Sequence, residues 1–267
     1  MFMTTLATYL QIANNQSKWQ AMTAKSPDVA TQTQYFEDNI GKVTSIDEFM
    51  KNSRLFNYAM TAFGLGSMTY AKGLMQKVLE GGVSSNSALA NTISSANIKA
   101  FAQAFDFAAN GETTTTSSTL VDNVVSRYTE QALETSQGQQ NPGVQLALYF
   151  QQHAPDLTSA YGILADSNIL TVVQTALGIS SSTSSQSIDT QYRLLSSKVN
   201  VDDFKDPKKL QQFIARFAAQ YDYNNGGDAN SQSSLLSTLF DTSGSGSSFG
   251  LDSSLLLNMQ GMKFGYF

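Results

Sequence analysis

Residues 35–64, YFEDNIGKVTSIDEFMKNSRLFNYAMTAFG, decide the fold, because residues 149–178, YFQQHAPDLTSAYGILADSNILTVVQTALG, match them without a gap. About eight of the roughly thirty aligned positions are identical, where chance would give roughly two. Apolar character is kept at many others, as in the pair Phe49 and Ile163. We interpret this match as an internal duplication.

The duplication predicts two tandem homologous helical modules. The match continues outward with small shifts, from Pro27 with Pro142 to Asp106 with Asp222, each of these acids standing between two aromatic residues. Ser/Thr/Gly-rich stretches lie between and after the copies, as expected of linkers. We therefore divide the chain into module one with its leading helix (1–110), a linker (111–117), module two with its leading helix (118–225), a flexible linker (226–250) and an apolar C-terminal segment (251–267).

The hydrophobic pattern predicts an all-α protein. Apolar residues recur at three- and four-residue spacing in both copies, and Gly64 and Gly178 follow as helix stops. Ser167 is the predicted N-cap of the second of these helices. Three prolines stand directly after good capping residues, which places helix starts at Pro27, Pro142 and Pro207. Residues 4–25 and 118–135 have helical periodicity and are predicted to be long leading helices.

The composition excludes many kinds of chemistry. The chain has no Cys, one His, and only 14% charged residues, where about a quarter is usual. Disulfides, thiolate nucleophiles, sulfur-ligated zinc and paired-His metal sites are therefore excluded. A net charge of -5 without a basic tract argues against nucleic-acid and anionic-membrane surfaces. We predict no catalytic residue, no cofactor, no metal and no enzyme activity.

Targeting features are equally sparse in the sequence. No apolar stretch approaches the ~20 residues that a membrane-spanning helix needs. The first residues lack a basic region followed by an unbroken apolar run, so no cleaved signal peptide is visible. We expect either a cytoplasmic protein or one exported by a route that reads no cleavable signal.

Several motifs that resemble catalytic or metal-binding sites have simpler structural interpretations. Residues 246–250 fit a serine-hydrolase pattern, but no histidine follows them. His153 aligns with Asn39, so we interpret it as a surface or capping residue. Asp222 begins a partial calcium loop that lacks its final glutamate. Asp106 and Asp222 stand at the close of the last predicted helix of each module and are predicted to fix that end by hydrogen bonding.

The apolar C-terminal segment is the predicted partner-binding element. An apolar segment on a flexible tether either folds back on its own core or meets a partner, and the sequence leaves both alternatives open. The candidate partner-binding residues are Leu255, Leu256, Met259, Met262, Phe264 and Phe267.

Several strings resemble a known family. They include residues 39–49, 159–166, 176–178 and 203–210, and the C-terminal run 255–263. These residues are similar to the flagellum-associated domain-of-unknown-function family 1217 of alphaproteobacteria, whose members commonly carry two copies of the domain. The resemblance covers most of the chain outside the linkers, and it implies a cellular context without a catalytic mechanism.

The family context implies two alternative functions. The first is an exported structural or assembly-associated flagellar protein that binds rod, hook, filament or export components and possibly itself. A chain without Cys, rich in Ser, Thr, Asn and Gln and without a cleaved signal is typical of such exported proteins. The second is a cytoplasmic helper or regulator that binds flagellar export or assembly proteins.

Overall fold

The computed structural model describes residues 4–93 and 95–225, and within these ranges the chain is all-α with no β-strand. The α-helices are α1 (Thr5–Ala13), α2 (Gln16–Ala24), α3 (Pro27–Ile40), α4 (Ile46–Lys51), α5 (Ser53–Ala62), α6 (Lys72–Gly81), α7 (Leu89–Thr92), α8 (Ala96–Ala104), α9 (Phe107–Asn110), α10 (Ser118–Gln140), α11 (Pro142–His153), α12 (Ala160–Ala165), α13 (Ser167–Leu177), α14 (Ile188–Lys198) and α15 (Pro207–Asn224). The 3-10 helices are η1 (Gly66–Met68), η2 (Gly111–Thr116), η3 (Ala154–Asp156), η4 (Ser181–Ser185) and η5 (Val201–Lys205).

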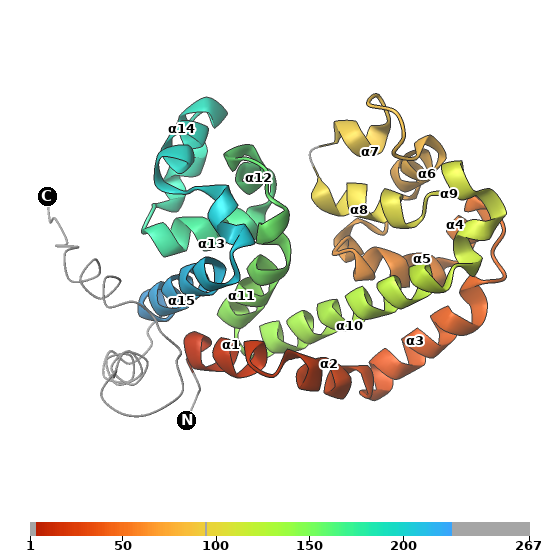
Figure 1. Cartoon of the computed structure of the whole chain (residues 1–267), viewed down its shortest axis with the longest axis horizontal. Helices are drawn as coiled ribbons and strands as arrows, with labels where there is room; N and C mark the ends of the chain where they lie inside the picture. The colour runs from red at the N-terminus through yellow and green to blue at the C-terminus, as the bar shows by residue number, and fades with distance from the viewer. Residues whose placement is uncertain (1–3, 94, 226–267) are drawn as a thin grey trace, which may run out of the picture.

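The helices form two lobes on a shared base (Figure 1). Helix α10 runs along this base from one lobe to the other, and α1, α2 and α3 run beside it in the opposite direction. The first lobe comprises α3 to α9 with the start of α10. The second lobe comprises α11 to α15 and is completed by α1.

The two aligned stretches fold into the same succession of helices, α3–α4–α5 and α11–α12–α13. Gly64 and Gly178 follow the last helix of each set with φ of 68° and 64°, a conformation that glycine adopts without steric penalty. In both places the next residue donates its N–H to the carbonyl five positions earlier, at 2.7 and 2.8 Å. These are the bonds of a Schellman C-cap, so both glycines end their helices.

The start of the last helix in each set differs from the prediction. The N-cap of α13 is Asp166 and not Ser167, because the Asp166 carboxylate accepts the N–H groups two and three residues ahead. Asn52 caps α5 in the aligned position. A tyrosine seventeen residues upstream contacts each cap: Tyr149 Oη donates to Asp166 Oδ2 at 2.6 Å, and Asn52 Nδ2 donates to Tyr35 Oη at 3.1 Å.

Each lobe has its own apolar core. The core of the first lobe is rich in phenylalanine, with Phe49 stacked on Phe105 at 4.9 Å between ring centroids. The core of the second lobe is more aliphatic and includes Ile163, Ile169 and Val173. A small third cluster, formed by Ile12, Leu133 and Val144, joins α1, α10 and α11 between them.

Helix α1 and the N-terminal part of α10 pack on the lobe opposite to their place in the sequence, whereas the C-terminal part of α10 packs on α11. Leu6 and Tyr9 of α1 belong to the core of the second lobe, although α1 precedes the first. Leu120 and Val124 of α10 belong to the core of the first lobe, although α10 precedes the second. The packing therefore crosses the predicted module boundaries at both leading helices.

The first leading stretch is also not the single long helix expected for residues 4–25. It breaks at Asn14 and Asn15 into α1 and α2, with Asn15 at φ -134°. Asparagine is a poor helix former whose side chain competes for backbone hydrogen bonds. Helix α10 is unbroken and extends to Gln140, five residues beyond the predicted end.

The predicted linkers lie in different surroundings. Residues 111–117 form η2 and the start of α10, with Thr114 and Thr115 buried. The Thr115 hydroxyl donates to the Val43 carbonyl and so ties this stretch to the first lobe. Residues 226–250 and the apolar segment 251–267 lie outside the described residues.

Candidate functional site

The residues predicted from the sequence do not form a site within the described chain. The six candidate partner-binding residues, Leu255 to Phe267, lie outside the described residues, as does the hydrolase-like stretch 246–250. Gly64 and Gly178 have the structural role described above. The candidate site below therefore comes from the structure.

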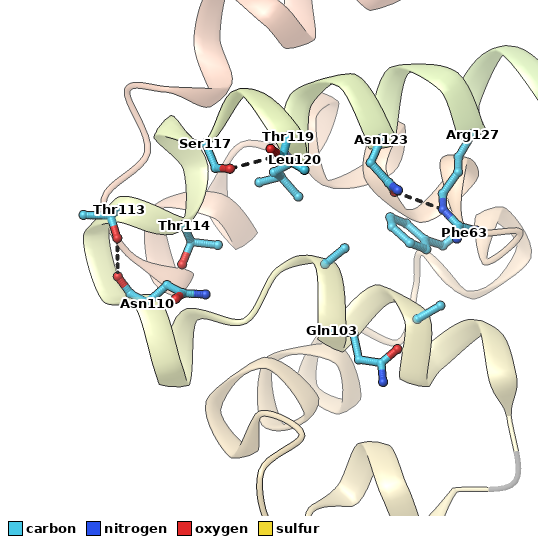
Figure 2. A pocket seen from close by; sticks show the side chains of 12 residues that line it. Phe63, Gln103, Asn110, Thr113, Thr114, Ser117, Thr119, Leu120, Asn123 and Arg127 are labelled. Atoms are coloured by element: carbon cyan, nitrogen blue, oxygen red, sulfur yellow. Dashed lines mark hydrogen bonds between the residues drawn. The ribbon is translucent and has the colours of Figure 1, made fainter.

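A polar cleft of about 520 Å³ lies in the first lobe between α8, the α9–η2 corner and α10 (Figure 2). Its size falls within the range of ligand-binding pockets. Helix α10 forms one wall and α8 lies opposite, as Figure 2 shows. The cleft is lined by Phe63, Ala100, Gln103, Ala104, Asn110, Thr113, Thr114, Ser117, Thr119, Leu120, Asn123 and Arg127.

The corner between α9 and η2 is built by local hydrogen bonds. Thr113 Oγ1 donates to the Asn110 carbonyl at 2.8 Å, and Thr114 Oγ1 donates to the Gly111 carbonyl at 2.9 Å. Ser117 then caps α10 by accepting the Leu120 N–H at 3.4 Å. Hydroxyl groups of this kind stabilise turns and helix starts, so this wall of the cleft is ordered by its own sequence.

Arg127 supplies the positive charge of the cleft. Its Nε donates to Asn123 Oδ1 at 3.0 Å, one helical turn earlier on α10, and its guanidinium lies 5.0 Å from the centroid of the Phe63 ring. A stacked, hydrogen-bonded guanidinium is held in one orientation and keeps its terminal nitrogens for a ligand. Within the part of the chain that the structure describes, no acidic residue lines the cleft, so no carboxylate from these residues balances the charge of Arg127 there.

Several polar groups of the cleft are free to bind. Among the described residues, the side-chain amides of Gln103 and Asn110 and the terminal nitrogens of Arg127 have no hydrogen-bond partner in the protein. Gln103, Asn110 and Asn123 are exposed. The cleft thus offers amide donors and acceptors, one guanidinium and a small apolar floor that includes Leu120. This combination can bind an extended peptide through its backbone, with an acidic group placed at Arg127.

Sequence reasoning missed this cleft for a physical reason. Residues 111–117 were assigned to a linker because a run of threonines after Gly111 is typical of coil. Asn123 and Arg127 are four residues apart and so share one face of α10, which was the signal in the sequence. Nothing in the sequence indicated that α8 would face them.

A second, smaller cavity of about 170 Å³ lies where α1 and α2 meet α10 and α11. Two carboxyl groups line it. Burial raises the pKa of Glu134 to about 8, and burial also raises the pKa of Glu130. Gln20 and Gln152 donate to the two oxygens of Glu130 at 3.2 and 2.8 Å. These bonds connect three helices, so we assign this cavity a structural role.

The remaining residues singled out in the sequence have structural roles. His153 is the last residue of α11 and stands at the N-cap position of η3, without a side-chain capping bond. It is half-buried, its ring lies 4.2 Å from the Tyr149 ring, and burial lowers its pKa. Both shared acids accept hydrogen bonds, but not at the end of the helix that each was predicted to close. Asp106 caps the start of α9, and Asp222 accepts the N–H of Thr5 at the start of α1, at 3.1 Å. Asp222 lies inside α15 and therefore does not begin a calcium loop.

The described residues contain neither a cluster of metal ligands nor a membrane-spanning helix. In residues 4–93 and 95–225, no three His, Asp or Glu side chains gather as metal ligands would. No helix in that part of the chain is both long and apolar enough to cross a membrane.

Comparison with known proteins identifies the family. The family model described as a protein of unknown function, DUF1217, matches residues 62–210, more than half of the chain. The crystal structure of an Agrobacterium tumefaciens protein, a structural genomics target, is 36% identical and superposes with a TM-score of 0.77. The match covers 83% of this chain and 94% of that one. No curated protein matches significantly. The chain therefore belongs to the DUF1217 family.

Proposed function

We propose that this protein is a non-enzymatic structural or assembly-associated component of the bacterial flagellum that binds other flagellar subunits. The flagellar context rests on the resemblance of residues 39–49, 159–166 and 203–210 to a flagellum-associated family. The binding role rests on the polar cleft of the first lobe. The location that we propose for the protein is the flagellum or the outside of the cell.

The observation that carries the proposal is the set of polar groups around the cleft that have no hydrogen-bond partner among residues 4–93 and 95–225. Gln103 and Asn110 each present an amide donor and an amide acceptor, and Arg127 presents guanidinium donors, in a cleft of about 520 Å³. Peptide backbones alternate donors and acceptors, so such a wall suits an extended segment of a protein partner. The lone positive charge favours a segment that carries an acidic side chain.

Motility and fractionation test the proposal together. A tagged copy should be found in sheared filaments or hook–basal bodies, and deletion of the gene should reduce motility. A copy with Gln103→Ala and Asn123→Ala should fold normally, because both side chains are exposed, yet restore motility less well than the unaltered protein. Arg193→Ala, at an exposed position on α14 outside the cleft, serves as the matched control and should restore motility fully.

Fractionation also separates the alternative role. Protein found only in the cytosol of motile cells would contradict the structural role and favour a cytoplasmic helper of flagellar export or assembly. Full rescue by the Gln103→Ala, Asn123→Ala copy would contradict the cleft as the binding site.

A further inference from the structure

Helix α1 packs in the second lobe, although it precedes the first lobe in the sequence. Its apolar residues Leu6, Tyr9 and Ile12 are 5%, 1% and 0% exposed. They pack against α11 and α15, which begin more than a hundred residues later in the chain. Without α1, the second lobe would expose the surface that these side chains cover. The lobe therefore requires an amphipathic helix that its own consecutive elements do not supply.

The surface on which α1 docks, called its seat below, includes Asn141, Gly143, Tyr221 and Asp222 and fits closely around the first turn of α1. The Asp222 carboxylate accepts the Thr5 N–H at 3.1 Å, and Asn141 Nδ2 donates to Thr5 Oγ1 at 3.0 Å. Gly143 allows this close approach, because a Cβ there would lie 2.5 Å from the Tyr221 ring and 2.8 Å from Thr5 Oγ1. A carboxylate at a helix N-terminus also stabilises the helix dipole.

The segment that links α1 covalently to the rest of the chain is short. Two residues, Asn14 and Asn15, separate α1 from α2, and α2 buries none of its own residues. Helix α2 is held on the base chiefly by α10, including the bond from Gln20 to Glu130 at 3.2 Å. The corresponding leading helix, α10, is a continuous helix of 23 residues. A continuous helix through residues 14 and 15 would remove the non-helical backbone of Asn15, whose φ is -134°, and so would change the direction of α1 relative to α2.

We propose that α1 is exchangeable: the α1 helix of one copy docks on α11 and α15 of another copy and thereby joins the two chains. The same residues fill the same seat in both arrangements, so the only structural change lies at the Asn14–Asn15 hinge. Short hinges of this kind are where domain swapping arises. If the second copy does not dock its own α1 on the first copy, one end of the pair has an unoccupied seat and the other end has an undocked α1. Further copies then add at these ends and form a linear assembly. This inference does not use the polar cleft and can fail independently of the proposed function.

Disulfide trapping between full-length chains tests the exchange, since the chain has no Cys of its own. Two differently tagged chains, one with Thr5→Cys and the other with Asp222→Cys, are unfolded together and refolded at high concentration. Exchange predicts a mixed disulfide on a non-reducing gel, with a yield that rises with protein concentration. In unexchanged monomers each cysteine is buried against its own chain, so the mixed disulfide should be absent.

A second pair of variants is the matched control. Gln20→Cys and Glu130→Cys lie at the α2–α10 contact, beyond the hinge from α1. Placed on separate chains, they should give no mixed disulfide even when the first pair does. Equal trapping by both pairs would mean non-specific association and would overturn the proposal.

A third measurement keeps the seat intact and changes only the hinge. Asn14→Ala with Asn15→Ala favours a continuous helix, so light scattering should show a several-fold larger fraction of dimers and longer assemblies than for the unaltered chain. Asn168→Ala, an exposed asparagine on α13, should not change that fraction. A hinge variant that stays monomeric at every concentration, with no Thr5–Asp222 mixed disulfide, would overturn the proposal.

Discussion

The two lobes differ in how their cores are closed. The first lobe stacks aromatic rings such as Phe49 and Phe105 and is closed by α10, which follows it directly in the chain. The second lobe has a more aliphatic core and is closed by α1, through a contact between Thr5 and Asp222 that spans 217 positions. Shape and apolar pattern, rather than nearness in sequence, therefore decide which lobe a leading helix completes.

The largest expected effect comes from removing the anchor of α1. Tyr9→Ala deletes a side chain that is 1% exposed, so we expect a loss of about 3–5 kcal/mol in the free energy of unfolding. Lys18→Ala, at an exposed position on α2, is the control and should change little. Urea denaturation measures both. A loss below about 1 kcal/mol for Tyr9→Ala would show that α1 does not close the second lobe.

The junction between the lobes should respond to pH through Glu134. Its folded-state pKa is raised to about 8 from 4.5, so stability from the protonated carboxyl is fully present below about pH 4.5 and is lost as the pH rises through about 8. Glu134→Gln carries no ionisable proton, so its advantage over the unaltered protein should grow across that interval to several kcal/mol, because each pKa unit corresponds to about 1.4 kcal/mol. Thermal unfolding as a function of pH measures this difference. Parallel profiles for the two proteins would contradict the buried environment of Glu134.

A methyl group added in the seat of α1 should lower the free energy of unfolding more than one added on an exposed helix. Gly143→Ala places a methyl group against Tyr221 and Thr5, and we expect a loss of about 1–3 kcal/mol. Gly73→Ala on α6 meets nothing within 4 Å and should be neutral or slightly stabilising, because alanine favours helix. Chemical denaturation of the two variants gives the comparison. Equal effects would contradict the close approach of α1 to α11.

The smallest expected effect is the difference in stabilisation between the two tyrosine–cap hydrogen bonds. The hydrogen bond from Tyr149 to the Asp166 carboxylate is 2.6 Å long, whereas that between Asn52 and Tyr35 is 3.1 Å and joins neutral groups. Charge-assisted bonds are the stronger kind, so Tyr149→Phe should lose about 1.5–3 kcal/mol and Tyr35→Phe about 0.5–1.5 kcal/mol. Matched denaturation curves measure the difference. The reverse order would contradict the assigned geometry.

Much of the local structure could be predicted from the sequence. Helix starts at Pro27, Pro142 and Pro207 and helix ends at Gly64 and Gly178 follow from backbone chemistry that acts over a few residues. The helical class follows from apolar spacing. The common origin of the two aligned stretches stays a prediction, with their matching helix order and tyrosine–cap contacts in its favour.

The tertiary arrangement could not be predicted in the same way. An apolar face shows that a helix is buried but not which partner buries it, so α1 and α10 could not be assigned to their lobes. The break at Asn14 and Asn15 depends on this docking as well as on local propensity. The polar cleft also escaped prediction, because it needs α8 and α10 face to face. Residues 111–117 have the composition of coil, and only the structure shows that the Thr115 hydroxyl donates to the Val43 carbonyl.

The central claim, that α1 closes the second lobe, is tested most directly by amide hydrogen exchange in Tyr9→Ala. Loss of the α1 contact should reduce protection in α11 and α15 while α5 and α8 keep theirs, because opening is confined to the elements that lose buried contacts. The opposite pattern, with protection lost in α5 and α8 and kept in α11 and α15, is expected if residues 1–110 form one packed module. That result would contradict the account.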